Sequence, residues 1–332
     1  MSLSLTFLGT SASRPTVERG VSSIAVTREG ETMLFDCGEG TQRQMMRYGV
    51  SFNFGDLFFT HFHSDHILGA LGLMRTCSLQ GRTEPLRVWG PRGLTQLMKR
   101  AEAFGGERNT YPVTVTELDL GQKVQRKDYA IVPYAADHRG TLAYGYALVE
   151  ELRRGRFNPE LARELGIPEG PMWGRIHKGE SITLDDGTVV APERLVGPTR
   201  PGRTVVITGD SRPCAATIDV ARNADLLVHE STFSDEEKER AVETGHSTAR
   251  EAAEVAAAAG VRRLALTHFS ARFSVFTGDL AKEARSVFPH VTMAKDGLEI
   301  VVPFADEADA DSSVDASASA QSDRADSAQA DA

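Results

Sequence analysis

The segment His61-Phe62-His63-Ser64-Asp65-His66 places four potential metal ligands within six positions. An apolar run predicts a strand at Leu57–Thr60, directly before this segment, and helical periodicity predicts a helix at Ile67–Leu79, directly after it. Three histidines and an aspartate buried in one loop without a cation would leave unpaired polar groups, at a cost of several kcal/mol in total. The segment therefore predicts a metal site at the end of a strand.

The spacing within the loop predicts two cations. Residues two apart in an extended chain point the same way, so His61 and His63 can grip one cation. Asp65 and His66 come after the chain turns and can face a second cation. Imidazole and carboxylate ligands together suit zinc, with manganese or iron as alternatives.

Three further potential ligands, His138, Asp210 and His268, each stand just past a predicted strand. Taken singly, Asp210 is also explained as a turn residue, and either histidine as one satisfied by packing. Because the ends of parallel strands meet at one edge of a sheet, we expect the three to converge and to complete two metal spheres.

Apolar patterning predicts two β-rich halves, each ending in helices. In the first half we expect strands at Leu3–Leu8, Ser23–Thr27, Thr32–Asp36, Leu57–Thr60, Leu86–Trp89, Val113–Leu118, Ala130–Tyr134 and Ala143–Val149, and helices at Gln42–Tyr48, Ile67–Leu79 and Gly93–Phe104. In the second half we expect strands at Thr204–Thr208, Asp225–His229, Leu264–Thr267 and Leu298–Val302, and helices at Thr248–Ala259 and Gly278–Phe288. This order indicates two sheets packed face to face with helices outside.

Composition narrows the class of protein. The 332 residues allow one large domain or two small ones, and no apolar stretch is long enough to span a membrane. The N-terminus lacks the pattern of a secretory signal. The three cysteines, Cys37, Cys77 and Cys214, are widely spaced and odd in number, which argues against a disulfide framework and predicts a reducing cytoplasm. Each is expected to be a small buried residue.

Residues 305–332 form an acidic tail of Asp, Ser and Ala that carries most of the net charge of −9. With almost nothing to bury, this tail is expected to be disordered and solvating. The remainder of the chain is close to neutral and can carry a basic patch on one face.

Residues 150–203 interrupt the pattern, being rich in Gly, Pro and Arg with little apolar periodicity. We interpret them as an inserted arm. Its candidate phosphate contacts are Arg153, Arg154, Arg156, Arg175 and Lys178. Phe157 and Trp173 can pack on sugar or base. Composition alone favours a solvated loop.

Several motifs together make the chain resemble the metallo-β-lactamase superfamily, and within it the ribonuclease Z (tRNA 3′-endonuclease) family. The histidine-rich loop marks only the superfamily, whereas the run Asp36-Cys37-Gly38-Glu39-Gly40-Thr41-Gln42 and the loops His229-Glu230-Ser231-Thr232 and His246-Ser247-Thr248 narrow it. The resemblance covers roughly residues 3–302. It implies an αβ/βα four-layer sandwich over 1–304, with residues 150–203 as a protruding flexible arm that binds tRNA.

The resemblance also assigns ligands for two Zn²⁺ per subunit, with Mn²⁺ or Fe²⁺ possible. One cation would be held by His61, His63 and His138. The other would be held by Asp65, His66 and His268, and Asp210 would bridge them. Asp36 would orient a ligand from behind by hydrogen bonding, although a turn residue would also explain it.

The implied reaction is hydrolysis of a phosphodiester bond in precursor tRNA, after the discriminator base. Asp65 would orient the attacking water and accept its proton. His246, tuned by Glu230, would donate a proton to the leaving 3′ oxygen; an exposed loop histidine is the alternative. The resemblance further implies a cytoplasmic homodimer.

Two other functions remain open at this point. Similar chemistry serves relatives that act on small molecules, such as an arylsulfatase, a cyclic-nucleotide phosphodiesterase or a lactonase. A non-catalytic RNA-binding protein with a degenerate site is the other alternative, and the intact set of seven ligands argues against it.

Overall fold

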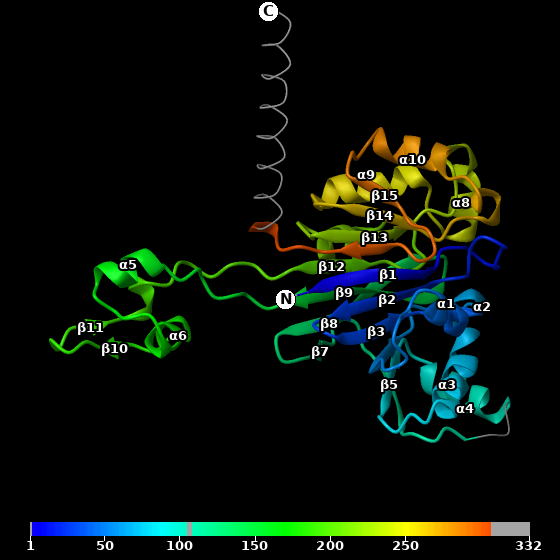
Figure 1. Ribbon diagram of the computed structural model, residues 1–332. Helices are drawn as coiled ribbons and strands as arrows, with labels where there is room; N and C mark the ends of the chain where they lie inside the picture. Colours follow the sequence, from blue (N-terminus) through cyan, green and yellow to red (C-terminus); the bar gives the residue numbers. More distant parts are fainter. Residues whose placement is uncertain (1, 105–107, 307–332) are drawn as a thin grey trace, which may run out of the picture. The chain divides into compact units, whose positions relative to one another are not determined.

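The computed structural model describes residues 2–104 and 108–306, and most of its strands form two seven-stranded sheets (Figure 1). The first sheet has the order β16-β1-β2-β3-β4-β5-β6. Its strands are β1 (Leu3–Gly9), β2 (Ser23–Arg28), β3 (Glu31–Phe35), β4 (Asp56–Phe58), β5 (Leu86–Gly90), β6 (Val113–Glu117) and β16 (Glu299–Val301). Strands β3 to β6 run parallel to one another, so their carboxyl ends share one edge.

The second sheet has the order β15-β14-β13-β12-β9-β8-β7. Its strands are β7 (Val124–Gln125), β8 (Tyr129–His138), β9 (Thr141–Glu150), β12 (Thr204–Ile207), β13 (Leu226–Glu230), β14 (Leu264–Thr267) and β15 (Val291–Met293). Strands β12 to β15 are parallel, and β12, β13 and β14 are mostly buried, as expected for strands covered on both faces.

Aromatic rings pack the two sheets together. Phe35 and Phe58 of the first sheet stack with their ring centroids 5.1 Å apart. Tyr146 of β9 meets the Phe58 ring edge-on at 5.4 Å, and its hydroxyl donates to the Phe59 carbonyl over 2.7 Å. These contacts fix one sheet against the other and hold β4, which leads into the histidine-rich loop.

Helices cover the outer faces of both sheets (Figure 1). The first sheet packs against α1 (Thr41–Arg47), α3 (Gly69–Leu79) and α4 (Leu94–Phe104), and the second against α9 (Ala249–Ala259) and α10 (Gly278–Arg285). The capping box of Thr248 and Glu251 starts α9, and Gly260 ends it with φ 65°. The predicted arrangement of two sheets with helices outside is confirmed.

Short elements escaped the sequence prediction. These are α2 (Ser64–Ile67), α7 (Ala215–Val220), α8 (Lys238–Thr244) and strands β7 and β15. Strand β8 runs to His138 and turns directly into β9, so His138 ends a long hairpin strand where the prediction had placed it beyond one. Cys37 and Cys77 are buried, whereas Cys214 is half-buried.

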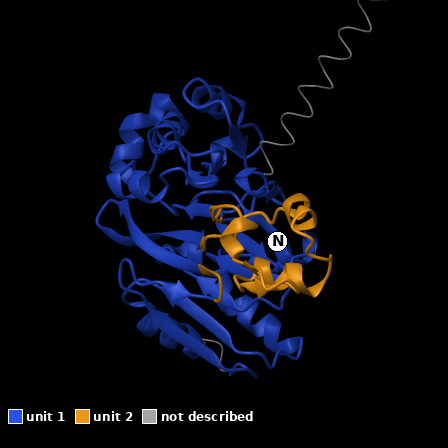
Figure 2. Cartoon of the chain, turned by 90° about the vertical axis from the view of Figure 1, so that its left-hand side faces the viewer, with its two compact units in different colours: residues 1–126, 130–149, 203–332 blue, residues 127–129, 150–202 orange. Residues whose placement is uncertain are grey.

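Residues 127–129 and 150–202 form a second compact unit, coloured separately in Figure 2. The sequence indicated little regular structure here, but the unit contains α5 (Pro159–Glu164), α6 (Pro171–His177), β10 (Ile182–Thr183) and β11 (Val189–Val190). Proline begins both helices, and apolar side chains around Ile176 form a small core of the unit's own.

The acidic tail predicted at 305–332 lies outside the described residues except for Ala305 and Asp306. Within the described part of the chain, no helix combines the length and apolarity needed to cross a bilayer.

Candidate metal centre

The polar residues predicted for the site stand at the ends of neighbouring strands. Asp36 follows β3, residues 61–66 follow β4, Asp210 follows β12 and His268 follows β14. His138 is the last residue of β8. Because the two sheets pack face to face, these strand ends bring the side chains to a common edge.

The structure brings all seven predicted ligands together. One group consists of His61, His63, His138 and Asp210, and another of Asp65, His66 and His268. Within each group, the candidate ligand atoms all lie within 4.8 Å of one another. The geometry therefore offers two adjacent positions for cations.

Asp210 faces both groups with different oxygens. Its Oδ2 atom lies 3.6 Å from His61 Nε2 and 3.9 Å from His138 Nε2. Its Oδ1 atom lies 3.3 Å from His66 Nε2 and 3.2 Å from His268 Nε2. This division is what a carboxylate that bridges two cations requires.

Hydrogen bonds fix the tautomers of the histidines on the β4 loop. His66 Nδ1 donates to Asp36 Oδ2 over 2.7 Å, because a carboxylate only accepts. The hydroxyl of Thr60 donates to the same carboxylate over 2.9 Å, so it accepts from His61 Nδ1 at 3.0 Å. Both Nε2 atoms are left with a lone pair that points into the site.

Hydrogen bonds also fix the Nδ1 atoms of the two histidines of the second sheet, His138 and His268. Thr232 Oγ1 donates to Glu230 Oε2 over 2.7 Å and therefore accepts from His268 Nδ1 at 3.0 Å. His138 Nδ1 donates to the Gly245 carbonyl over 2.8 Å. His138 thus also presents its Nε2 lone pair to the cluster, and His268 turns its Nε2 atom toward Asp65 Oδ2 at 3.3 Å.

Unpaired atoms show that this donor set fits a divalent metal. His61 Nε2, His66 Nε2 and Asp210 Oδ1 are buried and take part in no hydrogen bond. His63 Nδ1 lies 3.2 Å from His138 Nε2. Buried polar atoms without a partner are costly, and a cation bound by these imidazoles and the carboxylate would pair them.

The electrostatics of two histidines agree with this. Burial and the neighbouring His66 lower the pKa of His61 well below its usual value, which keeps it in the neutral form that binds metals. Burial also lowers the pKa of His66, but the carboxylates of Asp210 and Asp36 outweigh it and raise that pKa well above its usual value. The site therefore favours positive charge next to these carboxylates.

Backbone strain accompanies the site. Asp36 and His268 both have φ 58°, and Arg139, next to His138, has φ 40°. Left-handed backbone is unfavourable for residues with a Cβ, and such residues persist where the surroundings hold them in place. Here hydrogen bonds to Thr60 and Thr232 hold Asp36 and His268 respectively.

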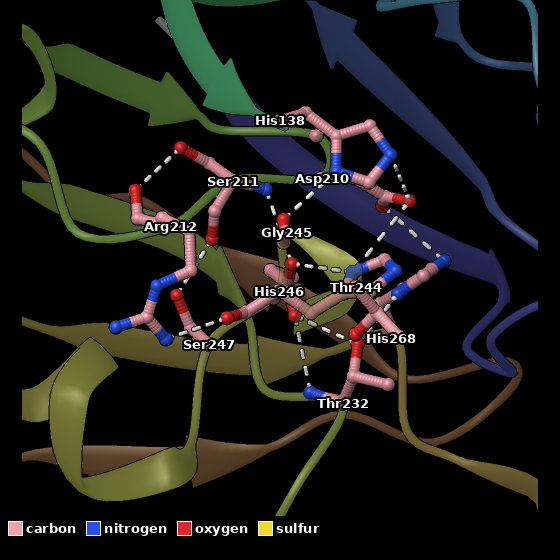
Figure 3. Close-up of polar contacts among 12 residues, drawn as sticks. His138, Asp210, Ser211, Arg212, Thr232, Thr244, Gly245, His246, Ser247 and His268 are labelled. Atoms are coloured by element: carbon pink, nitrogen blue, oxygen red, sulfur yellow. Dashed lines mark hydrogen bonds and ion pairs between the residues drawn. The ribbon is translucent and has the colours of Figure 1, made fainter. Parts of the chain in front are cut away.

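His246, which is labelled in Figure 3, lies beside the cluster and pairs with Glu230. His246 Nδ1 donates to Glu230 Oε1 over 2.7 Å and lies 3.8 Å from Asp210 Oδ2. Burial lowers the pKa of His246, but the Glu230 carboxylate outweighs it and raises the pKa to about 9. The imidazole is therefore held protonated, with 12% of its side chain exposed at the rim of the site.

The arm residues predicted to contact RNA lie in the second compact unit, and three have partners there. Arg154 donates to the His177 carbonyl over 2.8 Å, and Arg153 to the Pro201 carbonyl over 3.1 Å. Arg175 pairs with Glu180 at 2.8 Å. Their role toward RNA, like that of Arg156 and Lys178, stays a prediction.

Sequence reasoning missed the groups that hold the ligands from behind. Thr60, Thr232 and the Gly245 carbonyl each fix a histidine tautomer. Thr232 and Gly245 lie in or next to motifs singled out from the sequence, and Thr60 immediately precedes the histidine-rich loop. The only sign of this role in the sequence is that each of these residues lies in or beside a motif that contains a predicted histidine.

Replacing Gly245 with alanine should weaken metal binding. Gly245 has φ 80°, and an added Cβ would lie 2.7 Å from Arg139 Cβ and 3.1 Å from His138 Nδ1. We expect the strain to displace the carbonyl that orients His138 and to lower metal affinity by about 10- to 100-fold. Titration with a divalent metal, followed by mass spectrometry of metal content, measures this.

Gly49→Ala is the matched control. Gly49 also has a left-handed φ, 67°, but an added Cβ would meet nothing within 4 Å. Its cost is the backbone term alone, about 1 kcal/mol of stability, and metal affinity should be unchanged. Equal metal affinity in both variants would show that the Gly245 carbonyl does not position His138.

The sequence is similar to those of several known proteins. A family profile described as a beta-lactamase superfamily domain matches residues 194–269, and one described as anti-Pycsar protein Apyc1 matches residues 3–108. A protein named ribonuclease Z from Gemmatimonas aurantiaca is 65% identical over 92% of this chain and 98% of its own length. One of the same name from Myxococcus xanthus is 52% identical over 92% of this chain and 99% of its own length.

A solved structure agrees in fold. The crystal structure of the short form of human tRNase Z matches with a TM-score of 0.66 and 27% identity, covering 91% of this chain and all of that one (100%).

Proposed function

The chain belongs to the ribonuclease Z family, and from this we propose that it is the endoribonuclease that removes 3′ trailers from precursor tRNA. It cuts after the discriminator base and leaves a 3′ hydroxyl on the tRNA and a 5′ phosphate on the trailer. The observation that carries the proposal is the convergence of seven candidate metal ligands beside His246, which is hydrogen-bonded to Glu230. Cations that activate water and a nearby proton donor together suit hydrolysis of a phosphodiester.

We propose two Zn²⁺ ions as the resident metals. His61, His63 and His138 would hold one, Asp65, His66 and His268 the other, and Asp210 both. When bound, the cations activate water and stabilise negative charge on the phosphate. Asp36 keeps the ring of His66 in its binding orientation through the 2.7 Å hydrogen bond to Nδ1.

Asp65 is suited to handle the proton of the attacking water. Its Oδ2 atom accepts from the Ser13 amide over 2.7 Å, which fixes the carboxylate at the edge of the cluster. Helix α2 presents Asp65 and His66 side by side from its first turn. The carboxylate can thus orient the water and accept its proton.

His246 is suited to protonate the leaving 3′ oxygen. The alkoxide of a ribose leaves poorly without a proton, and His246 carries one next to Asp210. Glu230 is buried and accepts three further hydrogen bonds, from Ser211 N, Thr232 N and Thr232 Oγ1. A carboxylate held so firmly fixes the direction of the imidazole.

The second compact unit is proposed as the tRNA-binding arm, acting through its arginines and lysine. Exposed cations there can contact the phosphate backbone without reading sequence. We further propose a homodimer in the cytoplasm, in which the arm of one subunit serves the site of the other.

The decisive experiment incubates the purified chain with a precursor tRNA that carries a 3′ extension, with and without a chelator, and maps the product ends. We expect one cut after the discriminator base, a 3′ hydroxyl on the tRNA, and no cleavage after chelation. Scattered cuts, or cleavage that persists without metal, would overturn the proposal.

Removing the arm should separate tRNA recognition from hydrolysis. Val149 of β9 pairs with Thr204 of β12, so a short turn can replace residues 150–202 without breaking the sheet. Cleavage of precursor tRNA should fall at least about 10²-fold as phosphate contacts are lost. Hydrolysis of bis(4-nitrophenyl) phosphate should persist.

Alanine at Arg153, Arg154, Arg156, Arg175 and Lys178 together tests the same point with the unit's fold retained. This variant should show a higher KM for precursor tRNA and a shallower dependence of binding on salt. Unchanged tRNA cleavage in both variants would show that this unit is not the tRNA-binding arm.

A further inference from the structure

We infer that Arg212 is a positioning residue for the reaction, because its guanidinium group holds the backbone of His246 and thereby the proton that goes to the leaving oxygen. The inference rests on the proposed function. Among the described residues, the side chain of Arg212 makes no hydrogen bond to any predicted metal ligand. It bonds instead to the loop that carries His246 and to helix α9.

The side chain of Arg212 makes three short hydrogen bonds. Its Nη1 atom donates to the His246 carbonyl over 2.7 Å and to Glu251 Oε2 over 2.6 Å. Its Nη2 atom donates to Glu251 Oε1 over 2.6 Å. Because the guanidinium is planar, its two-point contact with Glu251 fixes the direction in which Nη1 meets His246.

Glu251 is itself immobile. Its side chain is only 5% exposed. Its Oε2 atom accepts from the Thr248 amide over 3.0 Å, and its own amide donates to Thr248 Oγ1 over 3.1 Å, which together form the capping box of α9. The arginine is thus anchored to the start of a buried helix rather than to a mobile surface carboxylate.

The backbone of Ser211 and Arg212, both labelled in Figure 3, forms hydrogen bonds with other parts of the site. Arg212 N donates to the Asp137 carbonyl over 2.7 Å, next to His138. Ser211 N donates to Glu230 Oε1 over 3.0 Å, and Ser247 Oγ donates to the Ser211 carbonyl over 2.6 Å. Residues 211 and 212, which directly follow Asp210, therefore connect the metal cluster, Glu230 and the His246 loop.

The other hydrogen bonds of the loop act on different atoms from the His246 carbonyl. His246 N donates to the Ala241 carbonyl over 2.8 Å, and its ring pairs with Glu230. Gly245, just before it, has the left-handed φ of 80°. Without Arg212 the His246 carbonyl loses its charged donor and Glu251 loses its bidentate partner. The imidazole then keeps its chemistry but loses its fixed position.

The test compares Arg212→Lys and Arg212→Ala with the wild-type chain on two substrates. Precursor tRNA has a leaving oxygen that needs a proton, whereas bis(4-nitrophenyl) phosphate releases a stable phenolate that does not. For both variants we expect kcat on precursor tRNA to fall by about 10²-fold, with KM and metal content unchanged. Hydrolysis of the ester should change by no more than about twofold.

Lysine retains positive charge against Glu251 and so preserves folding, but it cannot bond Glu251 at two points and His246 at once. For Arg212→Ala, added guanidinium at concentrations too low to unfold the chain should restore part of the tRNA activity. This rescue and the difference between the two leaving groups would not follow from a merely structural role.

Arg250→Ala is the matched control. Arg250 lies in the first turn of α9, beside Glu251, and pairs with Asp235 at 3.0 Å. Within the described chain it has no bond to the His246 loop. Its loss should leave both activities at the wild-type level. A similar fall in kcat on precursor tRNA in the control would show that losing any ion pair of α9 lowers activity, which would overturn the inference.

Other outcomes separate the inference from its premise. If wild-type protein cleaves precursor tRNA and Arg212→Lys does so equally fast, the inference alone is wrong. If the variants lose both activities in proportion, Arg212 supports the fold and not the proton donor, and the inference is again wrong. If wild-type protein cleaves the ester but never the precursor, the proposed function falls and the inference with it.

Discussion

An Asp210→Ala variant should lose cleavage of precursor tRNA by at least about 10³-fold, because one side chain faces both proposed cation positions. Its two oxygens face different histidine pairs at 3.2 to 3.9 Å. Without the carboxylate, imidazoles remain on both sides with less negative charge to hold cations. Metal content per chain should fall well below two in the same sample.

Asp225→Ala provides the control for this variant. Asp225 is also largely buried and accepts from the Thr204 amide over 2.8 Å, but it precedes β13, at the opposite end of that strand from Glu230. Its loss should cost about 1–3 kcal/mol of stability and leave metal content and kcat unchanged. Retention of two metals and full activity by Asp210→Ala would contradict the bridged site.

His246→Ala should lower kcat on precursor tRNA by about 10²- to 10⁴-fold while leaving metal content unchanged. The reason is the loss of the proton donor, since His246 belongs to neither of the two groups that contain the seven predicted ligands. Bis(4-nitrophenyl) phosphate should remain a substrate at close to the wild-type rate. Steady-state kinetics on both substrates, with metal analysis of the same preparation, measure the effect.

His290→Ala is the matched control, because His290 is exposed and lies outside the site. It should behave as wild type on both substrates. An equal loss of both activities in His246→Ala would instead assign His246 to metal binding, a possibility that its closeness to Asp210 and His268 makes worth testing.

Local pattern carried much of the fold prediction. Buried parallel strands such as Leu264–Thr267 consist almost entirely of apolar residues, and the ends of α9 are marked by Thr248, Glu251 and Gly260. The arm failed this test because α5 and α6 are short and their core is small, so neither leaves a long periodic signal.

The candidate ligands could be predicted because several histidines and acids each follow a predicted strand. The residues that hydrogen-bond these ligands could not be predicted, because those contacts depend on the three-dimensional packing. Thr232 acts on His268 across two strands, and the division of the two oxygens of Asp210 depends on how the sheets pack. Arg212, in a Gly-Asp-Ser-Arg turn, has the sequence character of a surface residue until its bond to His246 is seen.

The distribution of the donors along the chain has a consequence for synthesis. The first lie just after β4, but the last, His268, follows β14, and β1 is completed on one side only by β16 near the end of the described chain. A nascent polypeptide therefore lacks the last of the seven predicted ligands until His268 has left the ribosomal exit tunnel.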